Sequence, residues 1–466
     1  MISIGKPYIS GGVETPPEIY APRGCARIRT RKLSAYADPN PAPSLAERDL
    51  NQASGDTAYL RAPVHISEDT YKVYLEKTSH LKNTGWLTAV DYPPAVWQEE
   101  DCNLWFSAPA KFSEYFCTER SNAFVIAMLW YAVITGSDIR FEAPLSKKLY
   151  EGLTTKLIPA LCSGESTEVK LDGPVTDEPV EYAGGVLTGM SCGVDSLYTL
   201  HCYDRPDAPG GNRLTHLAYY DCNYLLPMIE PPYNISEIYR EKENVFSHII
   251  KHAEIIAEHH GLPLVVMRSN LDEDFYRGGR IYASMYRFLA CTLALEHLYG
   301  TYISSSSGHD SNMVEVSATV PTQHYEGLIC ECCQTESLHY VTSDNASRPE
   351  KLEALSDDED ARRFVAVCYD AGKHGENCGC CYACMKTMIP LDIMGKLEYF
   401  GESFDLDKYY SDRKGVFGNL ISFSKRPEAS SARESVQQIL RLADKYDNEA
   451  GRLFKEEYNA LSNKDI

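Results

Sequence analysis

The residues with the clearest chemical use form a short loop, Ser191 to Ser196, which reads Ser-Cys-Gly-Val-Asp-Ser. An apolar segment of strand type, Gly185 to Met190, precedes this loop, and the start of a helix, Leu197 to His201, follows it. A loop between a strand and a helix presents backbone N–H groups and hydroxyls to a phosphate. The pattern predicts a phosphate-binding turn, and the alternative is an ordinary strand-to-helix turn that is rich in small residues.

The residue types of this loop suit a nucleotide. Gly193 lets the backbone approach a phosphate and take unusual dihedral angles, while Ser191 and Ser196 offer hydroxyl groups to the β- and γ-phosphates. Asp195 can hold Mg²⁺, and the helix that follows adds the positive end of its dipole. A P-loop for γ-phosphate transfer needs a lysine that is absent here, which favours attack at the α-phosphate over kinase chemistry.

A second group of chemically useful residues is a run of cysteines near residue 380. Cys378, Cys381 and Cys384 have C-x₂-C-x₂-C spacing, and Cys368 lies ten residues before the first of them. Four thiolates in this arrangement suit tetrahedral Zn²⁺ in a closed, structural site. Iron–sulfur ligation is the alternative. Cys380 is expected to stay outside the set of ligands.

Other cysteines leave alternatives open. Cys330, Cys332 and Cys333 form a cluster without a fourth partner, expected to be thiols on a mobile loop, with a redox or sulfur-relay role as the alternative. Cys192 is expected to be a tolerated small side chain in the loop, and a nucleophilic or sulfur-carrying role is the other interpretation.

Strand and helix patterns alternate after Gly184. Segments 214–220, 264–267 and 302–305 are typical of strands, and segments 236–260 and 281–298 of helices. This alternation predicts an α/β fold with a parallel sheet built from right-handed βαβ units. Ligands of such sheets bind beyond the carboxyl ends of the strands. One pocket should therefore be lined by the loop, Asp221, residues 268–270 and residues 306–310.

The pattern before Gly184 differs. Residues 1–60 are rich in proline and glycine, and we expect irregular structure with a few strands. A helix is expected at 123–134 with Gly136 as its cap, a strand at 138–141, and a helix at 146–157 that stops before Pro159. The acidic segment 163–183 reads as a connector, and we place a domain boundary there.

Composition and charge restrict the class of protein. The chain has 466 residues, 44% of them apolar, and a net charge of −21, which makes nucleic acid an unlikely partner. The basic run from Arg23 to Lys32 is expected to be a solvated strand face. The longest apolar run, 123–134, is too short to cross a bilayer, and the first residues lack the layout of a signal peptide. With five of 16 cysteines between 368 and 384, we expect a cytoplasmic protein with a metal site rather than secretion.

Together, the loop and the cysteine run resemble those of 7-cyano-7-deazaguanine synthase, a family of the PP-loop ATP pyrophosphatase superfamily. The resemblance covers roughly residues 184 to 390. It implies a PP-loop fold of the adenine nucleotide alpha hydrolase type, a parallel sheet with helices on both faces. It also implies ATP and Mg²⁺ at the loop, a structural Zn²⁺, and a carboxylate that is activated by ATP and aminated by ammonia to an amide and then a nitrile.

The resemblance also implies roles for individual residues. Asp195, Ser196 and Arg287 are expected to be catalytic, with Arg280 a less certain counterpart of the family arginine; surface charge or an ion pair is the alternative for both arginines. His309 and Asp310 are candidates for substrate binding or acid–base work, or are solvated loop residues. The expected nucleotide-binding residues are Met190, Ser191, Cys192, Gly193, Val194, Asp195, Ser196, Tyr220 and Asn270, and the expected zinc ligands are Cys368, Cys378, Cys381 and Cys384.

Departures from the family mark this chain as a divergent relative. The synthases are shorter, usually carry glycine where Cys192 stands, have a basic run where Met385-Lys386-Thr387 stands, and differ in the loop at 308–312. The expected organisation is an α+β accessory domain over 1–180, a PP-loop ATP-binding domain over 181–325, a zinc-binding region over 326–400 and a helical tail over 401–466.

Three functions fit these observations. The first is a ligase-like enzyme that adenylates a small-molecule or peptide carboxylate and lets ammonia or an amine displace AMP. The second shares the adenylation step but delivers sulfur. The third is a nucleotide-binding partner protein without turnover, and we expect any protein partner or homodimer contact to use the N-terminal domain or the C-terminal helix.

Overall fold

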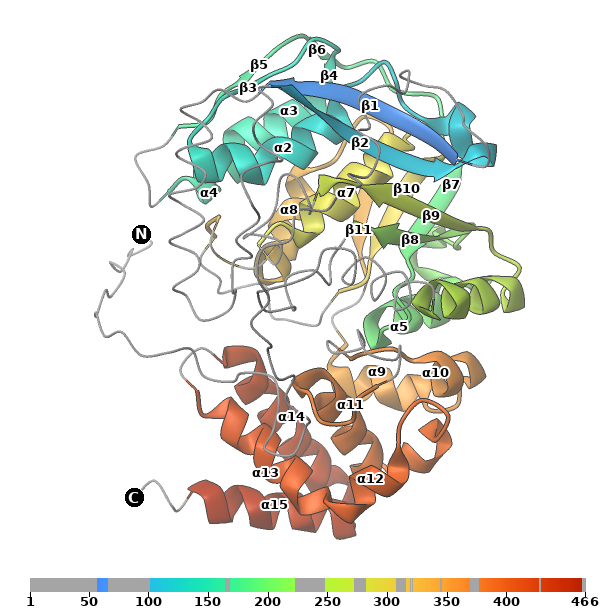
Figure 1. The fold of residues 1–466 in the computed structure, drawn as a ribbon, viewed down its shortest axis with the longest axis vertical. Helices are drawn as coiled ribbons and strands as arrows, with labels where there is room; N and C mark the ends of the chain where they lie inside the picture. The colour runs from blue at the N-terminus through green and yellow to red at the C-terminus, as the bar shows by residue number, and fades with distance from the viewer. Residues whose placement is uncertain are drawn as a thin grey trace, which may run out of the picture.

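The computed structural model describes residues 57–65, 101–163, 168–222, 248–271, 282–306, 316–318, 320, 322–343, 346–368, 377–426 and 429–462. In this part of the chain, a sheet flanked by helices occupies one end of the molecule. The other end is all-helical and is formed by the C-terminal elements (Figure 1). No helix among the described residues is long and apolar enough to span a membrane.

The sheet has seven strands in the order β1-β2-β9-β8-β7-β10-β11. The five strands from β9 to β11 are parallel, and β2 and β1 add an antiparallel pair beside β9. This confirms the expected α/β class and the mainly parallel sheet. The strands are β1 (Thr57–His65), β2 (Asp101–Pro109), β7 (Gly185–Gly189), β8 (His216–Asp221), β9 (Leu264–Ser269), β10 (Tyr299–Ser304) and β11 (His339–Thr342).

Both faces of the sheet are covered, because neighbouring strand residues point to opposite sides. In β8, Leu217 belongs to the buried cluster on one face of the sheet and Ala218 to the buried cluster on the other face. In β10, Ile303 lies in the same cluster as Leu217, and Tyr302 in the same cluster as Ala218. Helices α2 (Asn122–Thr135) and α7 (Ser284–Ala294) cover one face, while α5 (Val194–Tyr203) and the helix at 248–259 cover the other (Figure 1).

Helix α2 is buried almost completely, as its continuous apolar sequence predicts. It ends at Gly136, whose φ of 68° is left-handed, and the Gly136 N–H bonds back to Ala132 and Val133. Glycine adopts this conformation without steric cost, so the expected helix and its cap are both confirmed.

The helix expected to stop before Pro159 continues through it, so that prediction is wrong. Helix α3 (Lys147–Gly152), a π-helical turn η5 (Leu153–Leu157) and α4 (Ile158–Leu161) follow one another without a break. Within the π turn, the Ile158 N–H bonds to the Leu153 carbonyl, five residues earlier. A turn of this width accommodates a proline ring and its missing N–H, which would break an ordinary α-helix.

Several other boundaries differ from expectation. Helix α7 ends at Ala294, before the expected end at residue 298, and β10 already begins at Tyr299. The strand expected at 138–141 is the two-residue β3 (Ile139–Arg140), which pairs with β5 (Leu171–Asp172). A second short pair joins β4 (Leu145–Ser146) to β6 (Val175–Thr176).

Of the helix expected at 236–260, only the part from residue 248 lies within the described residues, and the basic run from Arg23 to Lys32 lies wholly outside them.

The all-helical end is formed by elements that follow β11. Phe417 and Phe454 meet edge to face in its core, and the buried Asp392 accepts hydrogen bonds from Arg413 and from the Tyr409 hydroxyl. Its helices are α9 (Arg348–Leu355), α10 (Glu359–Phe364), α11 (Tyr382–Ile393), α12 (Leu406–Ser411), α13 (Arg413–Ser424), α14 (Ser430–Tyr446) and α15 (Glu449–Ser462); α8 (Glu326–Cys332) precedes β11.

The described segments before residue 180 are continuous with the sheet. β2 pairs with β9, the Trp105 N–H donates to Asn270 Oδ1 (3.0 Å), and α2 packs along α7. Leu104 and Phe106 belong to the same buried cluster as α7. The domain boundary near residue 180 stays a prediction, but no gap in packing marks it among these segments.

A buried network of polar side chains stabilises the packing of these segments against the rest of the sheet domain. Asn122 of α2 donates to Glu296 Oε2 (2.8 Å), Thr335 donates to Glu296 Oε1, and the Ser146 N–H donates to Asn122 Oδ1 (2.9 Å). Glu296 is only 1% exposed. Burial raises its pKa, although these hydrogen bonds oppose the rise.

Glu296→Gln should therefore change the pH dependence of stability. Ionised Glu296 disfavours the fold, so wild-type stability falls as pH rises from the ordinary glutamate pKa through the raised one. The side chain of the variant cannot ionise, so this pH dependence is lost. The free energy of unfolding of the variant, relative to that of the wild type, should therefore increase between about pH 4 and about pH 8. Urea unfolding at both pH values measures the difference, and a difference independent of pH would contradict the assignment.

Candidate nucleotide and metal site

The predicted phosphate loop lies at the carboxyl end of the central strand. β7 ends at Gly189 and α5 begins at Val194, and the Met190 N–H bonds to the Ala218 carbonyl of β8 (2.6 Å). β8 lies on one side of β7 and β10 on the other. This reversal of strand order is the place where open α/β sheets bind ligands.

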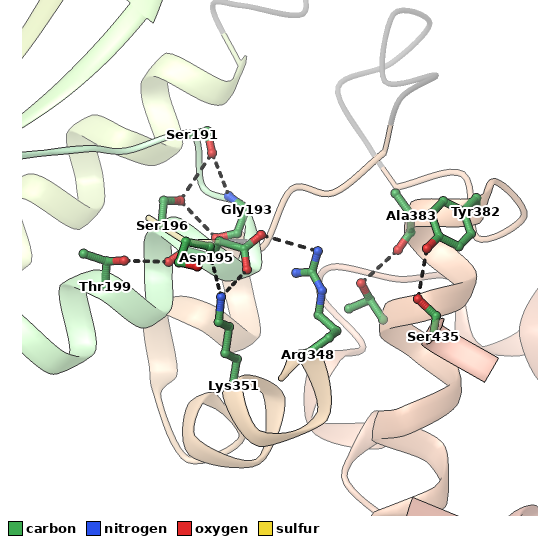
Figure 2. Close-up of polar contacts among 12 residues, drawn as sticks. Ser191, Gly193, Asp195, Ser196, Thr199, Arg348, Lys351, Tyr382, Ala383 and Ser435 are labelled. Atoms are coloured by element: carbon green, nitrogen blue, oxygen red, sulfur yellow. Dashed lines mark hydrogen bonds and ion pairs between the residues drawn. The ribbon is translucent and has the colours of Figure 1, made fainter. Parts of the chain in front are cut away.

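The two loop serines face each other (Figure 2). Their hydroxyl oxygens are 3.3 Å apart, Ser196 also donates to the Gly193 carbonyl (3.0 Å), and Ser191 is exposed. Gly193 is the N-cap of α5, and no side chain caps that end. Hydroxyls and uncapped helical N–H groups thus lie together, as an anion site requires.

The unusual dihedral angles of the loop belong to Cys192, and the expectation for Gly193 is wrong. Gly193 has ordinary extended angles (φ −76°, ψ 164°), whereas Cys192 has a φ of 58°. A residue with a Cβ is strained there by roughly 1–2 kcal/mol. The glycine that PP-loops usually carry at this position avoids that strain.

The Cys192 side chain points away from solvent. It is 0% exposed, and its thiol lies 3.8 Å from the Ile249 carbonyl. Burial raises the pKa of this thiol well above the ordinary cysteine value. A buried, protonated thiol is a poor nucleophile, which favours the interpretation as a packed small side chain.

Two cations from α9 contact the loop carboxylate (Figure 2). Lys351 Nζ lies 2.7 Å from Asp195 Oδ1, and Arg348 Nη2 lies 3.5 Å from Oδ2. The Lys351 side chain is 1% exposed and also donates to the Ser306 carbonyl, while Asp195 is 28% exposed. The carboxylate therefore faces the open side of the loop, and the lysine lies behind it.

Charge is concentrated around Asp195. Burial alone would raise its pKa, but Arg348 and Lys351, with Lys386 of α11, lower it. Burial and the same two cations lower the pKa of Lys386 to about 7. Two cationic side chains thus lie against one carboxylate, with Lys386 nearby, and Arg348 Nη1 is buried without a hydrogen-bond partner among the described residues. The site has unused capacity for an anion.

The contribution of α9 is absent from the sequence-based predictions. Its start is fixed by a capping box, in which the Ser347 N–H donates to Glu350 Oε2 (2.7 Å). That signal predicts a helix but not its approach to a loop far earlier in the chain. The one pointer in the sequence to a cation near the loop was Lys386, which lies in the segment where the 7-cyano-7-deazaguanine synthases usually carry a basic run.

Two predicted nucleotide-binding residues make structural contacts instead. The Tyr220 hydroxyl lies 2.8 Å from Thr292 Oγ1, and its ring stacks on Phe288 of α7. Asn270 is 5% exposed and accepts the hydrogen bond from β2. Both side chains support the packing beside the sheet, and neither has a described contact with the phosphate loop.

Arg287, the predicted catalytic arginine, is 0% exposed on α7, with its guanidinium 5.0 Å from the Phe288 ring centroid. No described contact joins it to Asp195 or Ser196. The other candidates, Arg280, His309 and Asp310, lie outside the described residues.

Asp221 and Arg268 lie at the carboxyl edge of the sheet, at the ends of β8 and β9. Their side chains form an ion pair of 3.2 Å. Asp221 is 7% exposed, and its Oδ1 has no hydrogen-bond partner in the described structure. This edge therefore presents a free acceptor next to the strand that carries the phosphate loop.

The four predicted metal ligands come together. The sulfur atoms of Cys368, Cys378, Cys381 and Cys384 all lie within 4.8 Å of one another. Gly379, with a φ of 72°, turns the chain after Cys378 so that Cys381 can begin α11. The Cys378 and Cys384 sulfurs are 3.9 Å apart, as are those of Cys368 and Cys381.

These sulfurs suit a zinc ion. Tetrahedral Zn²⁺ with Zn–S bonds of about 2.3 Å requires sulfurs about 3.8 Å apart. The N–H groups of Cys380 and Cys381 donate to the Cys378 sulfur (3.4 and 3.2 Å), and hydrogen bonds from Cys368 and the other two thiols lower the pKa of Cys378. Such donors stabilise a metal-bound thiolate. Cys380 is not in the group of four, although its sulfur lies 3.5 Å from the Cys378 sulfur.

The cluster Cys330, Cys332 and Cys333 was expected on a mobile loop, and that expectation is wrong. Cys330 and Cys332 belong to α8, Cys333 follows it directly, and all three are buried. Burial raises the pKa of each thiol, that of Cys332 to about 11. These thiols face the core because α8 packs there, and their environment gives no support to a sulfur relay.

No protein-family model, curated protein or solved structure matches this chain. The resemblance to 7-cyano-7-deazaguanine synthase therefore stays a prediction from two motifs. The contacts of Asp195 and the cysteine group are observations about this chain alone.

Zinc analysis tests the cysteine group. We expect about one zinc ion per chain, and Cys381→Ser should lower the content severalfold, because three thiolates hold the ion less firmly than four. Cys162→Ser, which removes a free thiol outside the group of four, is the control and should keep wild-type content. Equal zinc in both variants, measured by atomic emission, would show that the metal is bound elsewhere.

Proposed function

We propose that this chain binds Mg²⁺-ATP at the loop Ser191 to Ser196 and transfers AMP to a carboxylate, after which ammonia or an amine displaces AMP and gives an amide. The amide formed from ammonia becomes a nitrile only when a second ATP adenylates its oxygen and AMP leaves with that oxygen. Pyrophosphate leaves in the first step. The observation that carries the proposal is the contact of Arg348 and Lys351 with the loop carboxylate Asp195.

The charge of these side chains fits a departing polyphosphate. Pyrophosphate carries several negative charges, and cations already in place lower the barrier for its departure. Arg348 has a buried donor left over, and the uncapped start of α5 offers further N–H groups. Lys351, from α9, supplies a positive charge that the loop sequence itself lacks.

Asp195 suits Mg²⁺ because it is an anionic oxygen ligand on the open side of the loop. Bound Mg²⁺ would neutralise charge on the phosphates of ATP. Without nucleotide, Lys351 and Arg348 keep Asp195 ionised, so the carboxylate is ready to accept a cation at neutral pH.

The acceptor is proposed from the resemblance. A deazapurine-like carboxylate comes first, and a peptide or metabolite carboxylate second, because the chain departs from the synthases at 308–312. The cytoplasmic location and any partner of the N-terminal or C-terminal segments also stay predictions.

Sulfur transfer is less well supported, because Cys192, Cys330 and Cys333 are buried with raised thiol pKa values. A partner protein without turnover makes a different prediction. It would bind ATP without forming AMP, even with every acceptor offered.

The direct test incubates purified protein with Mg²⁺-ATP, ammonium and 7-carboxy-7-deazaguanine, and follows AMP together with the acceptor mass. AMP with the mass change of amidation or nitrile formation would establish the reaction. AMP with an unchanged acceptor would keep the adenylation step and redirect the search to other carboxylates. ATP binding without AMP would support the partner protein.

Lys351→Met should lower the rate of AMP formation by about 100-fold or more, because a fixed positive charge at the leaving group is lost. Asp195→Asn should have a similar effect through Mg²⁺. Lys445→Met is the matched control: Lys445 pairs with Glu353 on the outer side of the same helix α9 (2.9 Å) and should leave the rate unchanged. Wild-type rates in Lys351→Met would exclude its proposed role.

A further inference from the structure

The left-handed backbone at Cys192 needs support from outside the loop. Residues with a Cβ seldom adopt a φ of 58°, and they keep such a conformation only where neighbouring contacts impose it. Among the described contacts, the Cys192 carbonyl accepts a hydrogen bond of 2.8 Å from the Ala366 N–H. This bond joins the phosphate loop directly to the segment that follows α10.

That segment, residues 365–368, is in neither a helix nor a strand, and it ends at the predicted metal ligand Cys368. Its backbone therefore lacks the repeating hydrogen bonds of regular structure. Its position must be fixed by other groups if Ala366 is to hold Cys192 in place.

Asn377 is the group that fixes it. The side-chain oxygen accepts from the N–H groups of Val367 (2.9 Å) and Cys368 (3.2 Å). The side-chain nitrogen donates to the carbonyls of Val365 (2.8 Å) and Ser403 (2.9 Å). All four hydrogen-bonding positions of the amide are used, and three of them hold residues 365–368.

The predicted metal ligands Cys368 and Cys378 also hold residues 365–368 in position. Cys378 follows Asn377 directly, and its N–H lies 3.4 Å from the Cys368 sulfur. An ion bound to Cys368 and Cys378 would hold the end of this segment next to the asparagine. The four sulfurs have the spacing that such an ion requires.

We propose that Asn377 and the metal-binding cysteines position the phosphate loop. They hold residues 365–368 so that the Ala366 N–H keeps Cys192 left-handed, the conformation in which the loop binds nucleotide. This inference rests on the proposed function. Asn377 is a positioning residue, because it acts through Ala366 and Cys192 and has no described contact with Asp195.

The test measures Mg²⁺-ATP affinity of the full chain by calorimetry. Asn377→Ala should weaken binding about tenfold, while Asn448→Ala, which removes a similar amide that caps α15, should not.

The Cys192→Gly variant separates the positioning role from a general loss of stability. Glycine takes the left-handed conformation unaided, so adding Asn377→Ala to the Cys192→Gly variant should weaken binding by less than about threefold.

A second measurement tests the contribution of the metal ion. Removal of zinc with a chelator that does not bind magnesium should weaken ATP binding in the wild type and much less in Cys192→Gly. Zinc content and circular dichroism confirm that the metal has left and that the fold remains.

The outcomes are distinct. If wild-type protein binds no ATP, the proposed function fails. If it binds ATP but Asn377→Ala binds equally well, or loses the same affinity in both backgrounds, the positioning role is overturned.

Discussion

The buried ion pair between Lys351 and Asp195 is the contact on which the arrangement of this molecule depends. The Lys351 side chain is almost wholly buried, and an unpaired buried ammonium costs several kcal/mol. Asp195 and the Ser306 carbonyl accept hydrogen bonds from this ammonium. Since Asp195 begins α5 and Lys351 belongs to α9, this ion pair fixes how the helical end of the molecule meets the sheet.

The proposed anion site at this pair is compatible with the acidity of the chain. The net charge of −21 acts over the whole surface, where solvent and salt screen it. Arg348, Lys351 and Lys386 act at close range in a partly desolvated place, where each charge has a larger effect. Local arrangement therefore decides what this site attracts.

Local patterns in the sequence predict much of this structure. The strand–loop–helix around Asp195, the central parallel strands, Gly136 and the four cysteines all depend on residues close in the chain, so their signals are visible without a structure. The approach of α9 to the loop and the pairing of β2 with β9 depend on long-range packing and leave no periodic signal. The predicted role of Tyr220 and Asn270 at a nucleotide stays a prediction, since a place at a strand end does not say which way a side chain points, and their described contacts are with α7 and β2.

The antiparallel pair beside β9 has a consequence for self-association. Among the described strands, β1 forms the outer edge of the sheet, and Pro63 stands within it. Proline has no N–H to donate, and for this reason it is found in sheets mainly on edge strands. Its presence in β1 fits the place of this strand at the edge of the described sheet, and it removes one backbone donor from a strand on which growth of the sheet, into a paired dimer or a fibril, would depend.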